Sequence, residues 1–169
     1  VLPAGQRGEI RIRGPNTIAG YYKAPELTKK NFSGSGFWKS GDMGYMDEKG
    51  YLYLVDRKQD MIITGGYNVY AIEVENCLNS HPAIQNSAVV GLPHDLWGEE
   101  VRAMVMLVQG STTSPAELID HCKQHLARYK APKKIEIIDR LPLSPAGKVL
   151  RREVRQLLKE RDKPDVELV

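Results

Sequence analysis

The sequence has little cysteine and no long hydrophobic run, and each shortage excludes a class of protein. Its two cysteines, Cys77 and Cys122, lie far apart and lack the spacing of a zinc site or a CxxC motif. They fit reduced, buried thiols rather than a disulfide framework. No apolar stretch approaches the roughly 20 residues that cross a bilayer, and residues 1–4 lack the features of a signal peptide. We therefore expect a cytoplasmic protein.

A large charge of one sign is also absent. The 169 residues include 24 basic and 21 acidic side chains, a formal net charge of +3, which is too small to indicate nucleic-acid binding. The excess gathers in residues 148–163, where seven basic residues accompany three acidic ones. A basic helix of this kind has a weak attraction to an anionic membrane surface, and we expect its leucines in the core.

The sequence does contain enough apolar residues for a core. Hydrophobic side chains make up 41% of the chain and charged ones 27%, which is typical of a globular protein. The chain starts without methionine, close to a strand-like alternation at residues 8–13. We therefore expect a fragment of a longer protein.

The first third of the chain predicts strands and turns. One hairpin turns at residues 47–50, and a second pairs residues 61–64 with 67–70 around Gly65 and Gly66, which allow the positive φ of a two-residue loop. The polar stretch at residues 56–60 separates the two hairpins. We place a domain boundary there, between residues 1–58 and residues 59–169.

The rest of the chain predicts alternating helices and strands. Apolar periodicity indicates helices at residues 71–80, from Ser114 onward and around residues 150–158, and Ser114 with Glu117 forms a capping box. Strands are predicted at residues 87–92, 101–108 and 134–138. The expected fold class is α+β: a small β-rich N-terminal piece, then a compact C-terminal domain of a short sheet flanked by helices.

Four polar or glycine-rich stretches are the most informative motifs: residues 39–42 (KSGD), 56–60 (DRKQD), 64–68 (TGGYN) and 144–148 (SPAGK). In this order and spacing they resemble the C-terminal signature motifs of the adenylate-forming superfamily, which includes acyl-CoA synthetases, luciferases and adenylation domains. The run DRKQDMIITGGYNVYAIEVE is most similar to bacterial long-chain fatty-acid-CoA ligases. The resemblance covers essentially the whole chain. It implies that residues 1–58 end the large AMP-binding domain and that residues 59–169 form the mobile C-terminal domain.

The resemblance implies a role for each motif. Asp42 would accept hydrogen bonds from the two ribose hydroxyls of ATP, and Arg57 would donate to the ribose and phosphate oxygens. The alternatives are a turn aspartate and a surface ion pair of Arg57 with Asp56 or Asp60. Gln59 occupies the position of the pivot about which the C-terminal domain rotates, where the family usually has Asp or Lys.

The two remaining motifs would serve the two half-reactions. The loop of Gly65 and Gly66, with Tyr67, would line the pantetheine tunnel, although a plain hairpin turn explains the same glycines. Lys148 would be catalytic, because its ammonium group offsets the charge that builds up as a carboxylate attacks the α-phosphate of ATP. The alternative is one more cation at the start of a basic helix.

The implied activity is that of a fatty acyl-CoA synthetase, with fatty acid, ATP, coenzyme A and Mg²⁺ as reactants and cofactor. We expect the fragment to be inactive alone, because the phosphate-binding loop and acyl pocket would belong to the missing N-terminal part, as would most of the Mg²⁺ contacts. Open strand edges would favour self-association. One alternative is an adenylating enzyme for an aryl or amino acid that feeds a carrier protein, and another is a non-catalytic basic binding module.

Two further groups carry weaker signals. His121 and His125 are four residues apart on a predicted helix, but no HExxH motif is present, so a solvated face is favoured and no metal site is assigned. The basic cluster of Arg128, Lys130, Lys133 and Lys134 fits either contacts with coenzyme A phosphates or a solvated surface.

Overall fold

The computed structural model describes residues 2–162 and has the α+β fold that the sequence predicts. The chain divides into two compact units, Val1–Gln59 and Asp60–Val169. The short 3-10 helix η1 (Lys58–Asp60) lies where the two units meet in the sequence. No helix in the described part of the chain is long and apolar enough to span a membrane.

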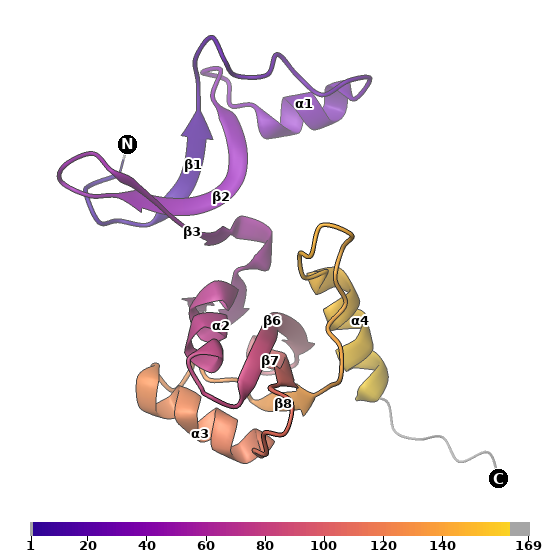
Figure 1. Ribbon diagram of the computed structural model, residues 1–169. Coiled ribbons are helices and arrows are strands. Elements are labelled where there is room, and N and C mark those ends of the chain that lie inside the picture. Colours follow the sequence, from indigo (N-terminus) through magenta and orange to yellow (C-terminus); the bar gives the residue numbers. More distant parts are fainter. Residues whose placement is uncertain (1, 163–169) are drawn as a thin grey trace. The chain divides into compact units, whose positions relative to one another are not determined.

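The first unit is built on a three-stranded antiparallel sheet in the order β1-β2-β3 (Figure 1). Its strands are β1 (Gly8–Ile12), β2 (Trp38–Met46) and β3 (Leu52–Arg57). The predicted hairpin at residues 47–50 is confirmed, since the amide of Gly50 donates to the carbonyl of Asp47 at 3.1 Å. Residues 39–42 form part of β2, not a loop between elements.

Helix α1 (Pro25–Asn31) was not predicted. Proline stands at its start, an acidic side chain in its first turn and two lysines in its last turn, all of which favour a helix. None of its residues is buried, so the apolar periodicity that identifies helices in a sequence is absent.

The second unit is a five-stranded sheet with helices on both faces (Figure 1). Strands run in the order β5-β4-β7-β6, and β8 pairs in parallel with β7 beside β4. The bounds are β4 (Ile62–Thr64), β5 (Tyr67–Val69), α2 (Ala71–Asn79), β6 (Ile84–His94), β7 (Gly98–Leu107), α3 (Pro115–His125), β8 (Lys134–Ile137) and α4 (Arg151–Arg161). Every helix and strand predicted for this unit is present, and the Ser114 capping box is confirmed.

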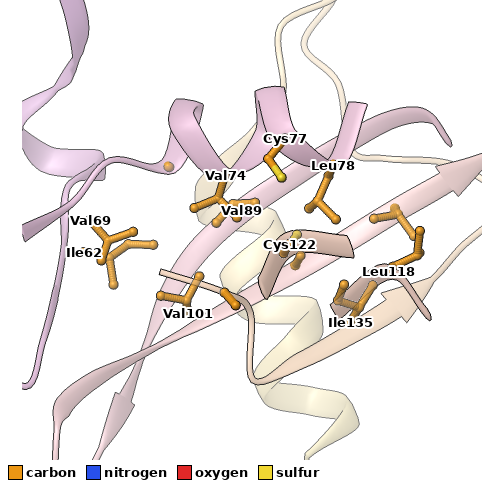
Figure 2. Packing of buried hydrophobic residues seen from close by; sticks show 14 of the residues in the cluster. Ile62, Val69, Val74, Cys77, Leu78, Val89, Val101, Leu118, Cys122 and Ile135 are labelled. Atoms are coloured by element: carbon orange, nitrogen blue, oxygen red, sulfur yellow. The ribbon is translucent and has the colours of Figure 1, made fainter. Parts of the chain in front are cut away.

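Two apolar clusters lie on opposite faces of the central strand β7. On one face, Val101, Ala103 and Val105 pack under α2 and α3 with Cys77 and Cys122, which are both free and buried as expected (Figure 2). On the other face, the cluster comprises Met104, Val154 and Leu158 together with Ala88, Val90, Leu92 and Leu141. Leu157, expected in the core with the other leucines of α4, is 38% exposed because it faces away from the sheet.

A buried arginine in β7 fixes the end of α4. Arg102 is 3% exposed and donates to both carboxylate oxygens of Asp162, at 2.6 and 3.0 Å, and to Glu100 at 2.9 Å. The hydrogen bonds from Arg102 lower the pKa of Asp162 from 3.8 to about 2. Because the folded state holds the ionised form, this carboxylate stabilises the fold above its unfolded pKa.

We predict that Asp162→Asn lowers the free energy of unfolding at neutral pH by about 1–2 kcal/mol. This is less than the cost of breaking a fully buried pair, since Asp162 is partly exposed and Arg102 keeps Glu100. The deficit should shrink as the pH falls from about 4 to about 2, because the wild-type carboxylate then takes up its proton. Urea unfolding of both proteins across this range measures the difference.

Asp120→Asn is the matched control, because Asp120 pairs with Lys123 three residues away on the exposed face of α3. Its cost should stay below about 0.5 kcal/mol. Equal losses in the two variants would contradict the prediction.

Candidate functional site

Asp42 and Arg57 face each other across the β2–β3 pair. The register pairs the two residues directly, and the Nε of Arg57 lies 2.9 Å from Oδ1 of Asp42. The guanidinium therefore pairs with Asp42, whereas sequence reasoning offered Asp56 or Asp60 as its partner. Both side chains are partly exposed, so a carboxylate that accepts and a guanidinium that donates are presented together.

A local distortion of β2 sets the position of Asp42. Gly41 has a φ of +78°, and the amide of Asp42 donates to Oγ of Ser40 at 3.0 Å. The same hydroxyl donates to the carbonyl of Ile10 in β1 at 2.9 Å. The Ser-Gly-Asp sequence thus makes a fixed bend within a strand, because glycine tolerates the positive φ and serine ties the bend to the neighbouring strand.

Gly65 and Gly66 form the predicted two-residue turn between β4 and β5. Their φ values are +56° and +82°, and Thr64 pairs with Tyr67 across the turn. A Cβ on either glycine would meet no atom within 4 Å, so the turn is exposed and demands glycine by its backbone alone.

Three contacts hold this turn in place. The amide of Gly65 donates to the carbonyl of Trp97 at 2.9 Å, and the amide of Ile63 donates to Glu99 at 2.8 Å. Tyr67 stacks on Tyr129 with ring centroids 4.6 Å apart. The loop that contains Trp97 is short, because β6 continues to His94 and β7 begins at Gly98.

Lys148 lies at the end of a closed, exposed turn. The amide of Ser144 donates to the carbonyl of Lys148, and the amide of Gly147 donates to that of Ser144, both at 2.8 Å. The Oγ of Ser144 also accepts from the amide of Lys148 at 3.1 Å. Among residues 2–162 no carboxylate forms an ion pair with the Lys148 ammonium, so its charge is available to a ligand.

Arg151, three residues after Lys148, anchors this turn to the sheet. Its guanidinium forms a bidentate ion pair with the buried carboxylate of Glu75 on α2, in which Nη2 donates to Oε2 at 3.0 Å and Nη1 donates to Oε1. The Nε of Arg151 also lies 3.4 Å from Oδ2 of Asp60. Glu75 also accepts from the amide of Val89 in β6 at 2.8 Å. Sequence reasoning missed this network, although an acidic residue on the apolar face of α2 was its visible sign.

Two members of the basic cluster form ion pairs with carboxylates of the described residues. Lys130 pairs with Glu73 at 2.5 Å, and Lys134 pairs with Asp162 and Glu136. A pocket of about 430 Å³ beside α3 is lined by Arg128, Lys133 and Lys123, among other residues. The part of the cluster that can meet an anion is therefore smaller than the sequence suggested.

The predicted site residues thus gather in three places. Asp42 and Arg57 lie together in the first unit, and Arg57 precedes by two residues Gln59, which is exposed in η1. Gly65, Gly66 and Tyr67 share one hairpin of the second unit, and Lys148 has a turn of its own there.

Residues 73–148 match the family described as AMP-binding enzyme C-terminal domain, which assigns this part of the chain to the C-terminal domain of the adenylate-forming superfamily. The 2-succinylbenzoate–CoA ligase of Bacillus cereus (strain Q1) is 41% identical over 160 residues, which are 95% of this chain and 33% of that protein. The chain therefore spans about a third of the length of this curated relative. The superfamily indicated by the motifs is confirmed, while the likeness to long-chain fatty-acid-CoA ligases in particular is not.

Solved structures agree with this assignment. ATP-bound MatB from Rhodopseudomonas palustris is 40% identical with a TM-score of 0.89, over 96% of this chain and 32% of that one. The o-succinylbenzoate CoA synthetase MenE from Bacillus subtilis, in complex with its acyl-adenylate intermediate OSB-AMP, is 39% identical with a TM-score of 0.83, over 91% of this chain and 31% of that one.

We predict that Arg151→Met destabilises the chain by about 3 kcal/mol. The substitution keeps much of the side-chain volume but leaves the Glu75 carboxylate buried without its cation. Chemical denaturation monitored by circular dichroism gives the free energy of unfolding.

Arg152→Met is the matched control, because the neighbouring Arg152 is exposed, and it should change stability by less than about 0.5 kcal/mol. The double variant Glu75→Gln with Arg151→Met should be more stable than Arg151→Met alone, since no charge is left unpaired. A double variant as unstable as the sum of both singles would count against the pair.

Proposed function

We propose that this chain forms the lysine-bearing C-terminal part of an adenylate-forming acid–thiol ligase that uses ATP and coenzyme A. The observation that carries the proposal is the exposed ammonium of Lys148, which has no ion pair among residues 2–162, on a turn that Arg151 anchors to a rigid domain. Adenylation joins a carboxylate to the α-phosphate of ATP, two groups of like charge. A cation delivered in a fixed geometry stabilises the transition state of such a step.

Asp42 and Arg57 supply the nucleotide contacts in this proposal. The carboxylate of Asp42 accepts hydrogen bonds from the vicinal ribose hydroxyls, and the Arg57 guanidinium, paired with that carboxylate, donates to nearby nucleotide oxygens. In residues 2–162 no cluster of three carboxylates offers a Mg²⁺ site.

The second half-reaction requires another surface of the domain. A turn of two glycines lets the thin pantetheine arm pass close to the backbone, and Tyr67, stacked on Tyr129, holds one wall of that passage. Because the Lys148 turn and the glycine turn are both closed by hydrogen bonds, the domain would change steps by turning as a body at Gln59.

For the acid, we propose a compact aryl acid of the succinylbenzoate kind in place of the long-chain fatty acid expected from the motifs. The support is the 41% identity to a ligase named for 2-succinylbenzoate, and the same type of enzyme recurs among similar structures. In those relatives the acceptor named is coenzyme A, which favours a free thiol over a carrier protein. ATP–pyrophosphate exchange with 2-succinylbenzoate and with palmitate, in the full-length enzyme, distinguishes the two acids.

In the full-length enzyme, Lys148→Ala should slow adenylation about a hundredfold, equivalent to about 3 kcal/mol of transition-state stabilisation. Thioester formation from supplied acyl-adenylate should continue, because that step does not use the ammonium. Each half-reaction is measured separately. Lys159→Ala, which removes another exposed lysine from α4, should leave both rates unchanged. Equal loss of both half-reactions in Lys148→Ala would refute the division of labour.

Gly66→Leu should show the opposite pattern, slowing thioester formation at least about tenfold while adenylation continues. The leucine side chain would fill the open space above the turn through which pantetheine passes. Gly110→Leu is matched for backbone strain, since Gly110 has a φ of +81° and equally open surroundings. If Gly110→Leu slows thioester formation as much, strain rather than obstruction is the cause.

A further inference from the structure

Three potential metal ligands converge where the end of α2 meets α3. One ring nitrogen from each of His121 and His125 and the Sγ of Cys77 all lie within 4.8 Å of one another. The histidines alone gave no reason to assign a metal from the sequence. The fold adds a cysteine from a helix more than 40 residues away, which Figure 2 shows on α2 above Cys122 of α3.

The hydrogen bonds of both histidines prepare them to bind a metal. The Nε2 of His121 lies 3.0 Å from the carbonyl oxygen of Cys77, and the Nδ1 of His125 lies 2.8 Å from that of His121. A carbonyl can only accept, so each of these nitrogens carries the proton and the other nitrogen of each ring has a lone pair. Metal-binding histidines in proteins ordinarily donate their second N–H in this way, which fixes the tautomer.

We propose that Cys77, His121 and His125 form a zinc-binding site that joins α2 to α3. One thiolate and two imidazoles are ligands that Zn²⁺ favours. Its tetrahedral geometry needs ligand atoms about 3.5 Å apart, and the three atoms already lie within 4.8 Å of one another. Cys77 is buried and His125 exposed, so the site opens to solvent at one side. Solvent water takes the fourth position.

The neighbouring groups are consistent with this assignment. His81 lies edge-on to His121, but its Nδ1 accepts from the amide of Ala83 at 3.2 Å, so it is a neighbour and not a ligand. Burial raises the pKa of the Cys77 thiol, which is therefore protonated in the absence of metal. As the S–Zn bond forms, the thiol releases its proton to solvent.

The test uses the reduced, chelator-treated 169-residue chain, titrated with Co²⁺ as a spectroscopic substitute for Zn²⁺. We expect a near-ultraviolet band from thiolate-to-cobalt charge transfer and visible bands of a tetrahedral ion, all abolished by one equivalent of Zn²⁺. Zn²⁺ should also raise the melting temperature, because it binds the folded state. These readouts require no enzymatic activity, so they test the metal site independently of the proposed ligase function.

Variants identify the ligands. Cys77→Ser should abolish the charge-transfer band, and His125→Ala, at an exposed position that the fold does not need, should weaken binding by more than about 100-fold. His94→Ala should bind as the wild type does, since this residue lies outside the ligand set. No charge-transfer band in the wild type, a band that persists in Cys77→Ser, or equal weakening by His94→Ala would each overturn the site.

Discussion

The ion pair between Arg151 and Glu75 is the constraint on which the second unit depends. Arg151 opens α4, Glu75 lies on α2, and the same guanidinium reaches Asp60, the residue that follows Gln59. Glu75 in turn accepts from a β6 amide, so one buried network links a helix on each face of the sheet to the sheet itself. Removing one partner of such a network lowers the free energy of unfolding strongly, because the other partner is left as a buried charge without solvation. It joins the Lys148 turn to Asp60, the neighbour of the proposed pivot Gln59, within the second unit.

The central strand β7 explains why the second unit is rigid. Both of its faces are buried, one under α2 and α3 and the other against α4, and it pairs along both edges. Each exposed turn that carries a proposed functional residue is closed by its own hydrogen bonds. In the proposed mechanism, the movement between the two half-reactions would therefore take place in the backbone between the units, where η1 contains Gln59.

Sequence reasoning succeeded where a residue's own chemistry decides the structure. The glycine pair predicted its turn, the capping box predicted the start of α3, and apolar periodicity predicted the elements of the second unit. It failed where pairing between distant segments decides. The strand register places Arg57 opposite Asp42, and helix packing brings Arg151 to Glu75. Cys77 lies near two histidines because α2 packs over α3. Helix α1 was not predicted because none of its residues is buried.

The turn of Gly65 and Gly66 has a stereochemical consequence. Their φ values are positive, yet a Cβ on either would meet empty space, so it is the handedness of an L-residue and not its bulk that the backbone opposes. A D-amino acid has the mirror-image preference and would occupy the same conformation without strain. Chemical synthesis could therefore place a D-configured side chain, a crosslinker or a fluorophore at this turn while the hairpin keeps its register. A reporter group could thus be attached to the backbone at these two positions, beside the proposed pantetheine path.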